Sequence, residues 1–227
     1  SGQDVQITLD LELQRVAEQP LGDKIGAIVA MDPRDGAIRA MVSRPTFAPN
    51  IFSTRITQAQ WEQNTKKGYP LVNRAVQSSY APASTFKVVT TTAGIESGKY
   101  SPDAVLPTYP FLNIGGIQFW DWNNAGFGPL GFRGAMAWSS DTFFYQIGRS
   151  VGEVVLQKWM RAYGLGSKTG IQVGVDEDPG LVPDAAWKRE VLGEPWNMGD
   201  TINASIGQGN VLATPLQITV MFAVVAN

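Results

Sequence analysis

The segment ASTFK at positions 83–87 places a serine hydroxyl three residues ahead of a lysine amine. Residues i and i+3 share one face of a helix, so Ser84 and Lys87 can lie side by side if the segment is helical. The chain of 227 residues contains no histidine and no cysteine. A histidine-based triad and thiolate catalysis are therefore excluded, and if Ser84 is a nucleophile, Lys87 is the candidate base.

A lysine base must be neutral, because only the uncharged amine accepts a proton. The pKa of a free lysine is about 10.4, and lowering it to about 7 costs about 4 kcal/mol. Burial can lower a lysine pKa by about 3 to 5 units. Residues 88–92 (VVTTT) are β-branched, and such a segment is helical only when packing on several faces holds it. The sequence therefore predicts a packed helix with a dry Lys87 in its first turn. The alternative is that Ser84 only caps the helix and Lys87 extends into solvent.

A second set of candidate residues stands in AWSSDTFFY, at 137–145. Ser139 and Asp141 form an S-x-D pattern, and a second hydroxyl near the first could relay a proton between Lys87 and an amine. The alternative is another helix cap, because Ser-Ser-Asp before an aromatic run is good capping chemistry. A third pattern, Lys168-Thr169-Gly170, stands in GSKTGIQV.

The composition limits the classes of function. Charge is nearly balanced, with 18 basic and 20 acidic residues and no basic stripe, which argues against nucleic acid as a partner. Without histidine and cysteine, disulfides, zinc ribbons and most catalytic zinc sites are excluded, and no metal or cofactor is expected. No apolar run approaches the roughly 20 residues of a membrane span, and no signal peptide opens the sequence. The 44% hydrophobic content suffices for a sizeable core.

The elements that must position these residues are predicted from turn and periodicity signals. GAIVAMDPRDGAIRAMVS predicts a β-hairpin, with apolar runs at 27–31 and 37–42 around a turn. VQITLDLELQRVAEQPL predicts a short strand followed by a helix that begins near Asp10. Residues 43–80 are expected to form loop and short helix, with Trp61 as an anchor. Further predictions are a polar Gly- and Pro-rich stretch at 97–130, helices at 134–152 and 153–166 with Gly164 closing the second, and a helix capped by Thr214 with Pro215 in its first turn.

Five sequence blocks together resemble the class B penicillin-binding proteins, in particular their cell-elongation branch. They follow the order known for that family and extend almost from end to end of the chain. The division-type branch usually carries Asn where Asp141 stands. The blocks are DPRDGAIRAMVSRPTFAPNIF, ASTFK, SSDTFFY, TGIQVGVDEDPGLVPD and WNMGDTINASIGQGNVLATPLQ. Agreement of several motifs in order and spacing weighs against the cap-only interpretation of Ser84.

The resemblance implies a role for each candidate residue. Ser84 is the nucleophile that becomes acylated, and its backbone N–H is one half of the oxyanion hole. Lys87 is the base, and Ser139 relays the proton. Asp141 contacts either the substrate amide or Lys87. A nearby anion would raise the lysine pKa, so Asp141 is expected to point away from the amine or to be paired elsewhere, and the sequence does not decide which.

The Lys168-Thr169-Gly170 pattern is predicted to be a look-alike of the family's third motif. In the family, a T-G-I block before GL.P lies outside the site, and the functional K-T/S-G follows the ATPLQ helix, inside which this sequence stops. Residues 1–227 are thus expected to be the N-terminal and central part of a transpeptidase domain, with reduced or no activity alone, because one lost oxyanion donor costs about 10²–10³-fold. Gly126-Phe127-Gly128 replaces a frequent Gly-His-Gly, which removes any metal-binding role of that histidine.

The resemblance further implies an α+β fold similar to serine β-lactamases and D,D-transpeptidases, an antiparallel sheet flanked by helices. Implied partners are peptidoglycan stem peptides ending in D-Ala-D-Ala, β-lactams, a membrane-embedded glycan polymerase and other elongation proteins. The implied location is the extracytoplasmic face of the bacterial inner membrane, with an N-terminal anchor helix absent from this chain. The alternatives are a class D-like or class A β-lactamase and a non-enzymatic β-lactam-binding sensor. Against the lactamases, class D usually has S-x-V where Ser139–Asp141 stand, and EVLGE lacks the class A E-x-x-L-N pattern.

Overall fold

The computed structural model describes residues 4–53, 55–66, 68–172, 174 and 176–227. Two of the sequence predictions fall partly outside the described residues. These are the predicted domain 1–227, at its start, and the block TGIQVGVDEDPGLVPD, at positions 173 and 175. The chain divides into two compact units, one of residues 1–79, 168–179 and 214–227, the other of residues 80–167 and 180–213. We refer to them as unit 1 and unit 2.

Unit 1 is built on the predicted hairpin. Its strands are antiparallel, with Ile28 opposite Val42 and Ala30 opposite Ala40, as the alternation around the turn predicted. The apolar residues Ala75, Val76 and Leu216 form its buried cluster. The helices and strands of unit 1 are α1 (Leu11–Leu21), β1 (Gly26–Met31), β2 (Ile38–Arg44), η1 (Pro49–Ser53), α2 (Gln58–Lys66) and α8 (Pro215–Ala226).

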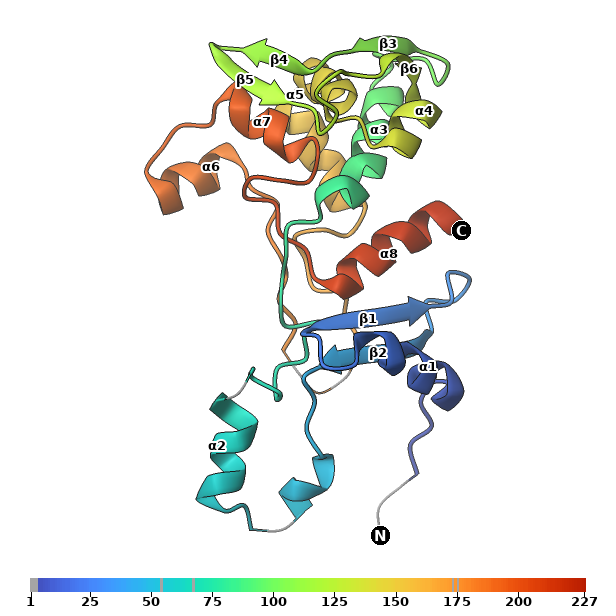
Figure 1. The fold of residues 1–227 in the computed structure, drawn as a ribbon, viewed down its shortest axis with the longest axis vertical. Helices are drawn as coiled ribbons and strands as arrows, with labels where there is room; N and C mark the ends of the chain where they lie inside the picture. Colours follow the sequence, from blue (N-terminus) through green and yellow to red (C-terminus); the bar gives the residue numbers. More distant parts are fainter. Residues whose placement is uncertain (1–3, 54, 67, 173, 175) are drawn as a thin grey trace. The chain divides into compact units, whose positions relative to one another are not determined.

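Two helices cover the hairpin, with α8 on the side of β1 and α1 on the side of β2 (Figure 1). The predicted helix start near Asp10 and the predicted cap at Thr214 are confirmed. Asp10 is the N-cap of α1, where its side chain accepts hydrogen bonds, and Thr214 caps α8, with Pro215 in its first turn. The strand predicted before α1 is wrong, since residues 4–10 are not in a strand. Trp61 is not an anchor either, because it is 48% exposed.

Unit 2 consists of packed helices with two pairs of antiparallel strands. Figure 1 shows both pairs at the same end of the unit, near α3, α4 and α5. The strands lie in the 97–130 stretch that the sequence predicted only as polar and rich in Gly and Pro. The elements are η2 (Ala83–Phe86), α3 (Lys87–Glu96), β3 (Val105–Thr108), β4 (Phe111–Ile114), β5 (Ile117–Trp120), β6 (Gly128–Gly131), α4 (Phe132–Trp138), α5 (Asp141–Ala162), α6 (Ala185–Trp187), η3 (Lys188–Leu192) and α7 (Met198–Ala204).

The strand pairs are β3–β6 and β4–β5, and β1–β2 is the third pair among the described residues. All three are antiparallel, which confirms the predicted α+β class. The helix α3 packs against α5 and buries Val89, Thr90 and Ala93, so the β-branched run is helical because tertiary packing holds it. That prediction is confirmed.

The predicted helical region after residue 134 contains two breaks. Gly152 has φ +81° inside α5, where the sequence analysis divided its two helices, and Gly164, at φ +85°, follows the end of α5 at Ala162. The other break was missed: α4 ends at Trp138, and its C-cap residue, Ser139, has a left-handed φ of 54° and ψ of 39°. This corner between α4 and α5 carries the second motif.

Gly207 positions the turn that carries Ser84. Its carbonyl accepts a hydrogen bond from the backbone N–H of Ala83 at 2.8 Å. A Cβ on Gly207 would lie 2.5 Å from both Ala83 O and Phe86 Cβ, and the backbone φ of Gly207 is +69°. Only glycine allows this close approach without a shift of the backbone.

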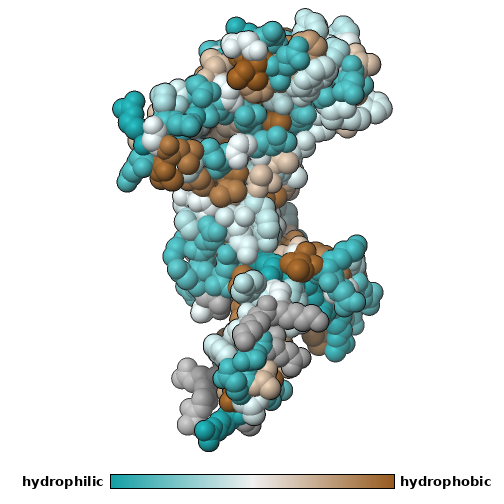
Figure 2. Space-filling view, turned by 60° about the vertical axis from the view of Figure 1, so that its left-hand side comes forward, coloured by the Kyte–Doolittle hydropathy of each residue, from teal (hydrophilic) through white to brown (hydrophobic). Residues whose placement is uncertain are grey.

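The surface shown in Figure 2 is mostly hydrophilic, with hydrophobic residues gathered in separate patches. Exposed large apolar residues include Trp122 at 61% and Trp138 at 58%, both in unit 2. Among the described residues, the search for membrane spans found no helix with the length and apolar character that crossing a bilayer requires.

Candidate active site

The turn that carries Ser84 leads directly into α3. Ser84 lies in η2, a 3-10 turn, and Lys87 begins the α-helix. Ser84 is exposed, whereas Lys87 is only 1% exposed. The alternative in which Lys87 extends into solvent is therefore wrong. The arrangement combines an accessible hydroxyl with a buried amine.

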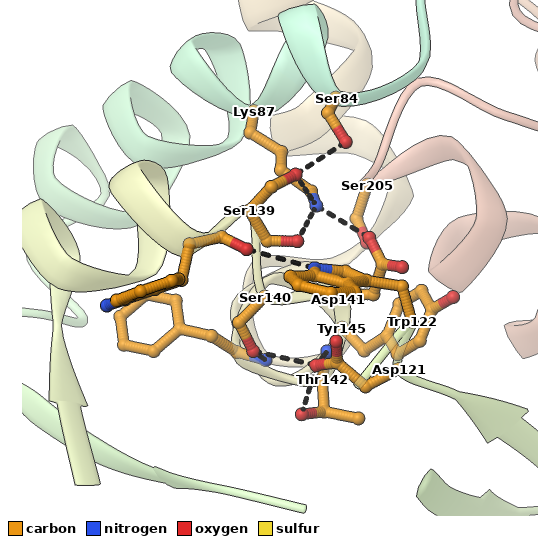
Figure 3. Close-up of polar contacts among 12 residues, drawn as sticks. Ser84, Lys87, Asp121, Trp122, Ser139, Ser140, Asp141, Thr142, Tyr145 and Ser205 are labelled. Carbon is orange, nitrogen blue, oxygen red and sulfur yellow. Dashed lines mark hydrogen bonds and ion pairs between the residues drawn. The ribbon is translucent and has the colours of Figure 1, made fainter. Parts of the chain in front are cut away.

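Ser139 bridges the two side chains. Its Oγ donates to Ser84 Oγ at 2.7 Å and accepts from Lys87 Nζ at 3.0 Å. Figure 3 shows this chain of contacts, with Ser139 between Ser84 and Lys87. The sequence predicted that Ser84 and Lys87 could meet side by side on the helix. In the structure the amine of Lys87 extends instead to the α4–α5 corner. The hydroxyl of Ser139 connects it to the hydroxyl of Ser84.

The amine of Lys87 has three acceptors. Besides Ser139 Oγ, it donates to the Ser139 carbonyl at 2.7 Å and to Asp141 Oδ1 at 2.6 Å. An ammonium has three donors, so all are used. If Lys87 loses one proton, it can keep its bonds to the carbonyl and the carboxylate. Its lone pair is then available to Ser139 Oγ, the only one of the three acceptors that can itself donate.

Burial lowers the pKa of Lys87, although the ion pair with Asp141 and the more distant Asp121 act in the opposite direction. Burial also raises the pKa of Asp141 against the pull of Lys87. The expectation that Asp141 points away from the amine or is paired elsewhere is wrong, because the two groups are in direct contact. Desolvation is the largest influence on both groups, so the net pKa shift of Lys87 is downward and that of Asp141 is upward despite their attraction.

The capping alternative for the second motif is resolved by the neighbour of Ser139. Ser140 is the N-cap of α5 and accepts from the N–H of Phe143. Ser139 is thus free of the capping task, and its left-handed backbone directs both its carbonyl and its hydroxyl to Lys87. For Ser84, no side-chain cap bond is formed at the start of η2 or α3.

The sequence analysis missed two residues beside the motif. Asp121, which is 2% exposed, accepts hydrogen bonds from Ser140 and Thr142, and Trp122 donates to the carbonyl of Trp138. The signal was an aspartate between two tryptophans in FWDWNN. A carboxylate among large apolar residues is buried only when hydrogen bonds satisfy it.

The Lys168-Thr169-Gly170 pattern lies in unit 1, whereas Ser84 lies in unit 2. The carboxylate of Glu177, which is 8% exposed, accepts from Thr169 N at 2.9 Å, Thr169 Oγ1 at 2.7 Å and Gly170 N at 2.9 Å. Lys168 pairs with Asp176 and has a side chain that is 52% exposed. The donors of this turn thus hold a carboxylate of the chain itself.

Within the part of the chain that the structure describes, no group of three or more His, Cys, Asp or Glu side chains could hold a metal ion. The polar atoms of the site are hydroxyls, one amine, a carbonyl and a carboxylate. Such a set can deprotonate a serine and return the proton to a leaving group, which are the steps of acyl transfer through a covalent intermediate.

Comparison with known protein families gives a match to the penicillin-binding protein transpeptidase domain over residues 26–227. Among curated proteins, the peptidoglycan D,D-transpeptidase MrdA of Acinetobacter baumannii is 39% identical over 229 residues, covering 100% of this chain and 34% of the relative. The chain therefore spans about a third of the length of the curated relatives it matches.

Solved structures show the same likeness. PBP2 of Pseudomonas aeruginosa, in complex with WCK 5153, has a TM-score of 0.94 and 33% identity, covering 100% of this chain and 52% of that one. PBP2 of Helicobacter pylori, in its complex with MreC, has a TM-score of 0.92 and 34% identity, covering 96% of this chain and 41% of that one. These agree with the fold predicted from the motifs.

Proposed function

Because the chain belongs to the penicillin-binding protein transpeptidase family, we propose that the complete protein is a peptidoglycan D,D-transpeptidase that acts through a seryl acyl-enzyme. The observation that carries the proposal is the contact chain from exposed Ser84 through Ser139 to buried Lys87. It joins a reachable nucleophile to an amine whose pKa burial lowers. The relatives' name, peptidoglycan D,D-transpeptidase, supports the substrate class.

In the acylation step, Ser84 Oγ attacks the penultimate carbonyl of a stem peptide that ends in D-Ala-D-Ala. The proton of Ser84 passes to Ser139 Oγ while the proton of Ser139 passes to neutral Lys87. This requires the hydrogen bonds along the chain to reverse, since in the charged state Lys87 and Ser139 are the donors. The backbone N–H of Ser84, in the 3-10 turn η2 that leads into α3, serves as one oxyanion donor.

The relay then runs in the opposite direction. Lys87 returns its proton through Ser139 to the amine of D-Ala, and D-Ala leaves with the C–N bond broken. The amine of a second stem peptide attacks the acyl-enzyme and gives up a proton to the same relay, which restores the Ser84 hydroxyl. Asp141 holds the amine of Lys87 through its 2.6 Å contact and, in this proposal, also faces the substrate amide.

The third-motif prediction is kept as part of the proposal: Lys168, Thr169 and Gly170 take no part in catalysis. It is supported by the bonds that commit the donors of Thr169 and Gly170 to Glu177. The proposal also includes β-lactams as acylating ligands and a location in the cell envelope with elongation proteins. The solved complex of a PBP2 with MreC supports the elongation role.

The test is covalent labelling of the full-length protein. A labelled penicillin should add its mass to Ser84 with one label per chain, and Ser84→Ala should remove the adduct. A folded wild type that gains no mass would refute the proposed chemistry. The matched control is Thr85→Ala, the neighbouring exposed hydroxyl, which should leave labelling within about 3-fold.

Two further measurements separate the alternatives. Rapid steady-state hydrolysis of nitrocefin by the full-length protein would indicate a β-lactamase, because a transpeptidase stays acylated. A cross-linking assay on stem-peptide substrates distinguishes an enzyme from a sensor domain, since labelling alone does not. Cross-linked product that is lost in Ser84→Ala is the expected result.

A further inference from the structure

Two adjacent residues hold both ends of the corner that carries Ser139. The corner is short, because α4 ends at Trp138 and α5 begins at Asp141. Its first residue, Ser139, has left-handed dihedral angles that residues other than glycine adopt rarely. Such a conformation persists only where the surroundings enforce it. The contacts that enforce it here come from the segment directly after β5.

The first contact lies on the side of α4. The indole Nε1–H of Trp122 donates to the carbonyl of Trp138 at 2.9 Å, and that carbonyl belongs to the peptide bond that begins Ser139. The Trp122 ring packs on Phe127 with ring centroids 5.4 Å apart, and Phe127 in turn stacks on the Trp138 ring at 5.9 Å. The indole is therefore held in place on one side of the corner.

The second contact lies on the side of α5. Asp121 Oδ2 accepts from Ser140 Oγ at 2.8 Å, from Thr142 N at 2.9 Å and from Thr142 Oγ1 at 2.9 Å. Asp121 is 2% exposed, so these bonds form away from water, where a carboxylate with few partners would be costly. Figure 3 shows Asp121 and Trp122 on the side of Ser139 that faces away from Ser84.

We propose that Asp121 and Trp122 are positioning residues that together fix the hydroxyl of Ser139 between Ser84 and Lys87. The proposal rests on the proposed function, in which that hydroxyl relays the proton. Neither residue touches the reacting atoms. They act on the two peptide segments that flank Ser139, and both of its catalytic contacts depend on its backbone: the carbonyl accepts from Lys87 at 2.7 Å and the hydroxyl from the same amine at 3.0 Å.

The decisive variant is Trp122→Phe in the full-length protein, because it removes the indole donor and keeps an aromatic ring. The matched control is Trp120→Phe, another exposed tryptophan two residues earlier on β5. Acylation by a labelled penicillin should be about 10-fold slower in Trp122→Phe and within about 2-fold of wild type in Trp120→Phe, because small displacements of a relay group are costly. The loss should be in the acylation step, with binding of the penicillin unchanged.

Asp121 is tested by two substitutions. Asp121→Ala removes all three bonds at Oδ2 and should slow acylation by about 100-fold. Asp121→Asn can turn its amide oxygen to the same three donors and should restore the rate to within about 5-fold of wild type. If Asp121→Ala does not fold, Trp122→Phe still decides the question.

A second readout separates positioning from a general structural role. In a Ser139→Ala background the hydroxyl that the pair positions is absent, so Trp122→Phe should slow acylation by no more than about 2-fold. An equal loss in both backgrounds, or equal rates for Trp122→Phe and Trp120→Phe, would overturn the positioning role while wild type is still labelled. Absence of label on Ser84 in wild type would instead refute the proposed function.

Discussion

Two turns of this protein carry short motifs with a lysine and a hydroxyl, and they differ in what surrounds the lysine. Lys87 and Lys168 each form an ion pair with an aspartate. The side chain of Lys87 is 1% exposed and its pKa is lowered by burial, whereas that of Lys168 is 52% exposed and its pKa is raised by its bond to Asp176. An aspartate partner alone therefore does not decide the protonation of a lysine.

A third lysine sharpens the comparison. Lys188 is also buried, at 3% exposure, but it bonds to both carboxylate oxygens of Asp200, at 2.9 and 2.7 Å, and lies 3.5 Å from Glu194. The hydrogen bond to Asp200 is the main reason that the pKa of Lys188 is raised, and Glu194 adds to this effect. Lys87 faces one carboxylate oxygen and two neutral oxygens, so less negative charge offsets its loss of water. Burial yields a neutral base only when few anions replace the water.

The largest expected difference between the two turns lies in the lysines. Lys87→Met should slow acylation of the full-length protein by a labelled penicillin by about 10³-fold, because it removes the amine that contacts Ser139 Oγ and serves as the base in the proposed relay. Lys168→Met, the matched change in the other turn, should leave the rate within about 2-fold. Stopped-flow or gel-based labelling measures both. A comparable loss in Lys168→Met would break the distinction and reinstate the third-motif interpretation of residues 168–170.

The next effect concerns the hydroxyls. Ser139→Ala should slow acylation by about 10²-fold, because the structure connects Ser84 to Lys87 through Ser139. Thr169→Ala, which removes the hydroxyl of the other turn, should have no effect on labelling. A Ser139→Ala protein that reacts at the wild-type rate would mean that Lys87 takes the Ser84 proton directly.

A smaller effect is expected in the pH dependence. In the proposed mechanism acylation needs neutral Lys87, so its rate should rise with pH through the lysine pKa, which burial lowers. Asp141 and Asp121 are the anions that raise this pKa, so Asp141→Asn should lower it further and move the rising limb to lower pH. Asp176→Asn is the control and should not move the limb. A limb that stays in place or moves to higher pH would show that Asp141 does not raise the pKa of Lys87.

The smallest effect concerns the stability of the fold and tests a structural role for the turn at residues 168–170. Burial raises the pKa of Glu177, but bonds from Thr169 and Gly170 outweigh it, so the folded pKa is lowered overall. The stabilisation is therefore present at neutral pH and lost as the pH falls through the folded pKa. Glu177→Gln should cost about 1–3 kcal/mol at pH 7 and less in acid, as measured by denaturant unfolding. Unchanged stability would contradict this structural role, and labelling of Ser84 should persist.

Part of the fold could be predicted because its signals are local. The hairpin around the turn at 32–36, the helix start near Asp10, the cap at Thr214 and the break at Gly152 all follow from backbone preferences of neighbouring residues. The strands in the 97–130 stretch could not be found, because each has four residues and β3 pairs with β6 across an inserted hairpin. Pairing partners so far apart leave little mark on a short sequence window.

The sequence by itself determined which groups could do the chemistry. The absence of histidine and cysteine and the spacing from Ser84 to Lys87 left a lysine as the base, and the order of the motifs assigned Ser139 and Asp141 to the same site. Motif order predicted that residues 168–170 are a look-alike, but motif spelling could not give the environment of either lysine. Tertiary structure set that environment, because burial, the number of nearby anions and the left-handed corner at Ser139 depend on residues far away in the chain, and these change the free energy of each protonation state.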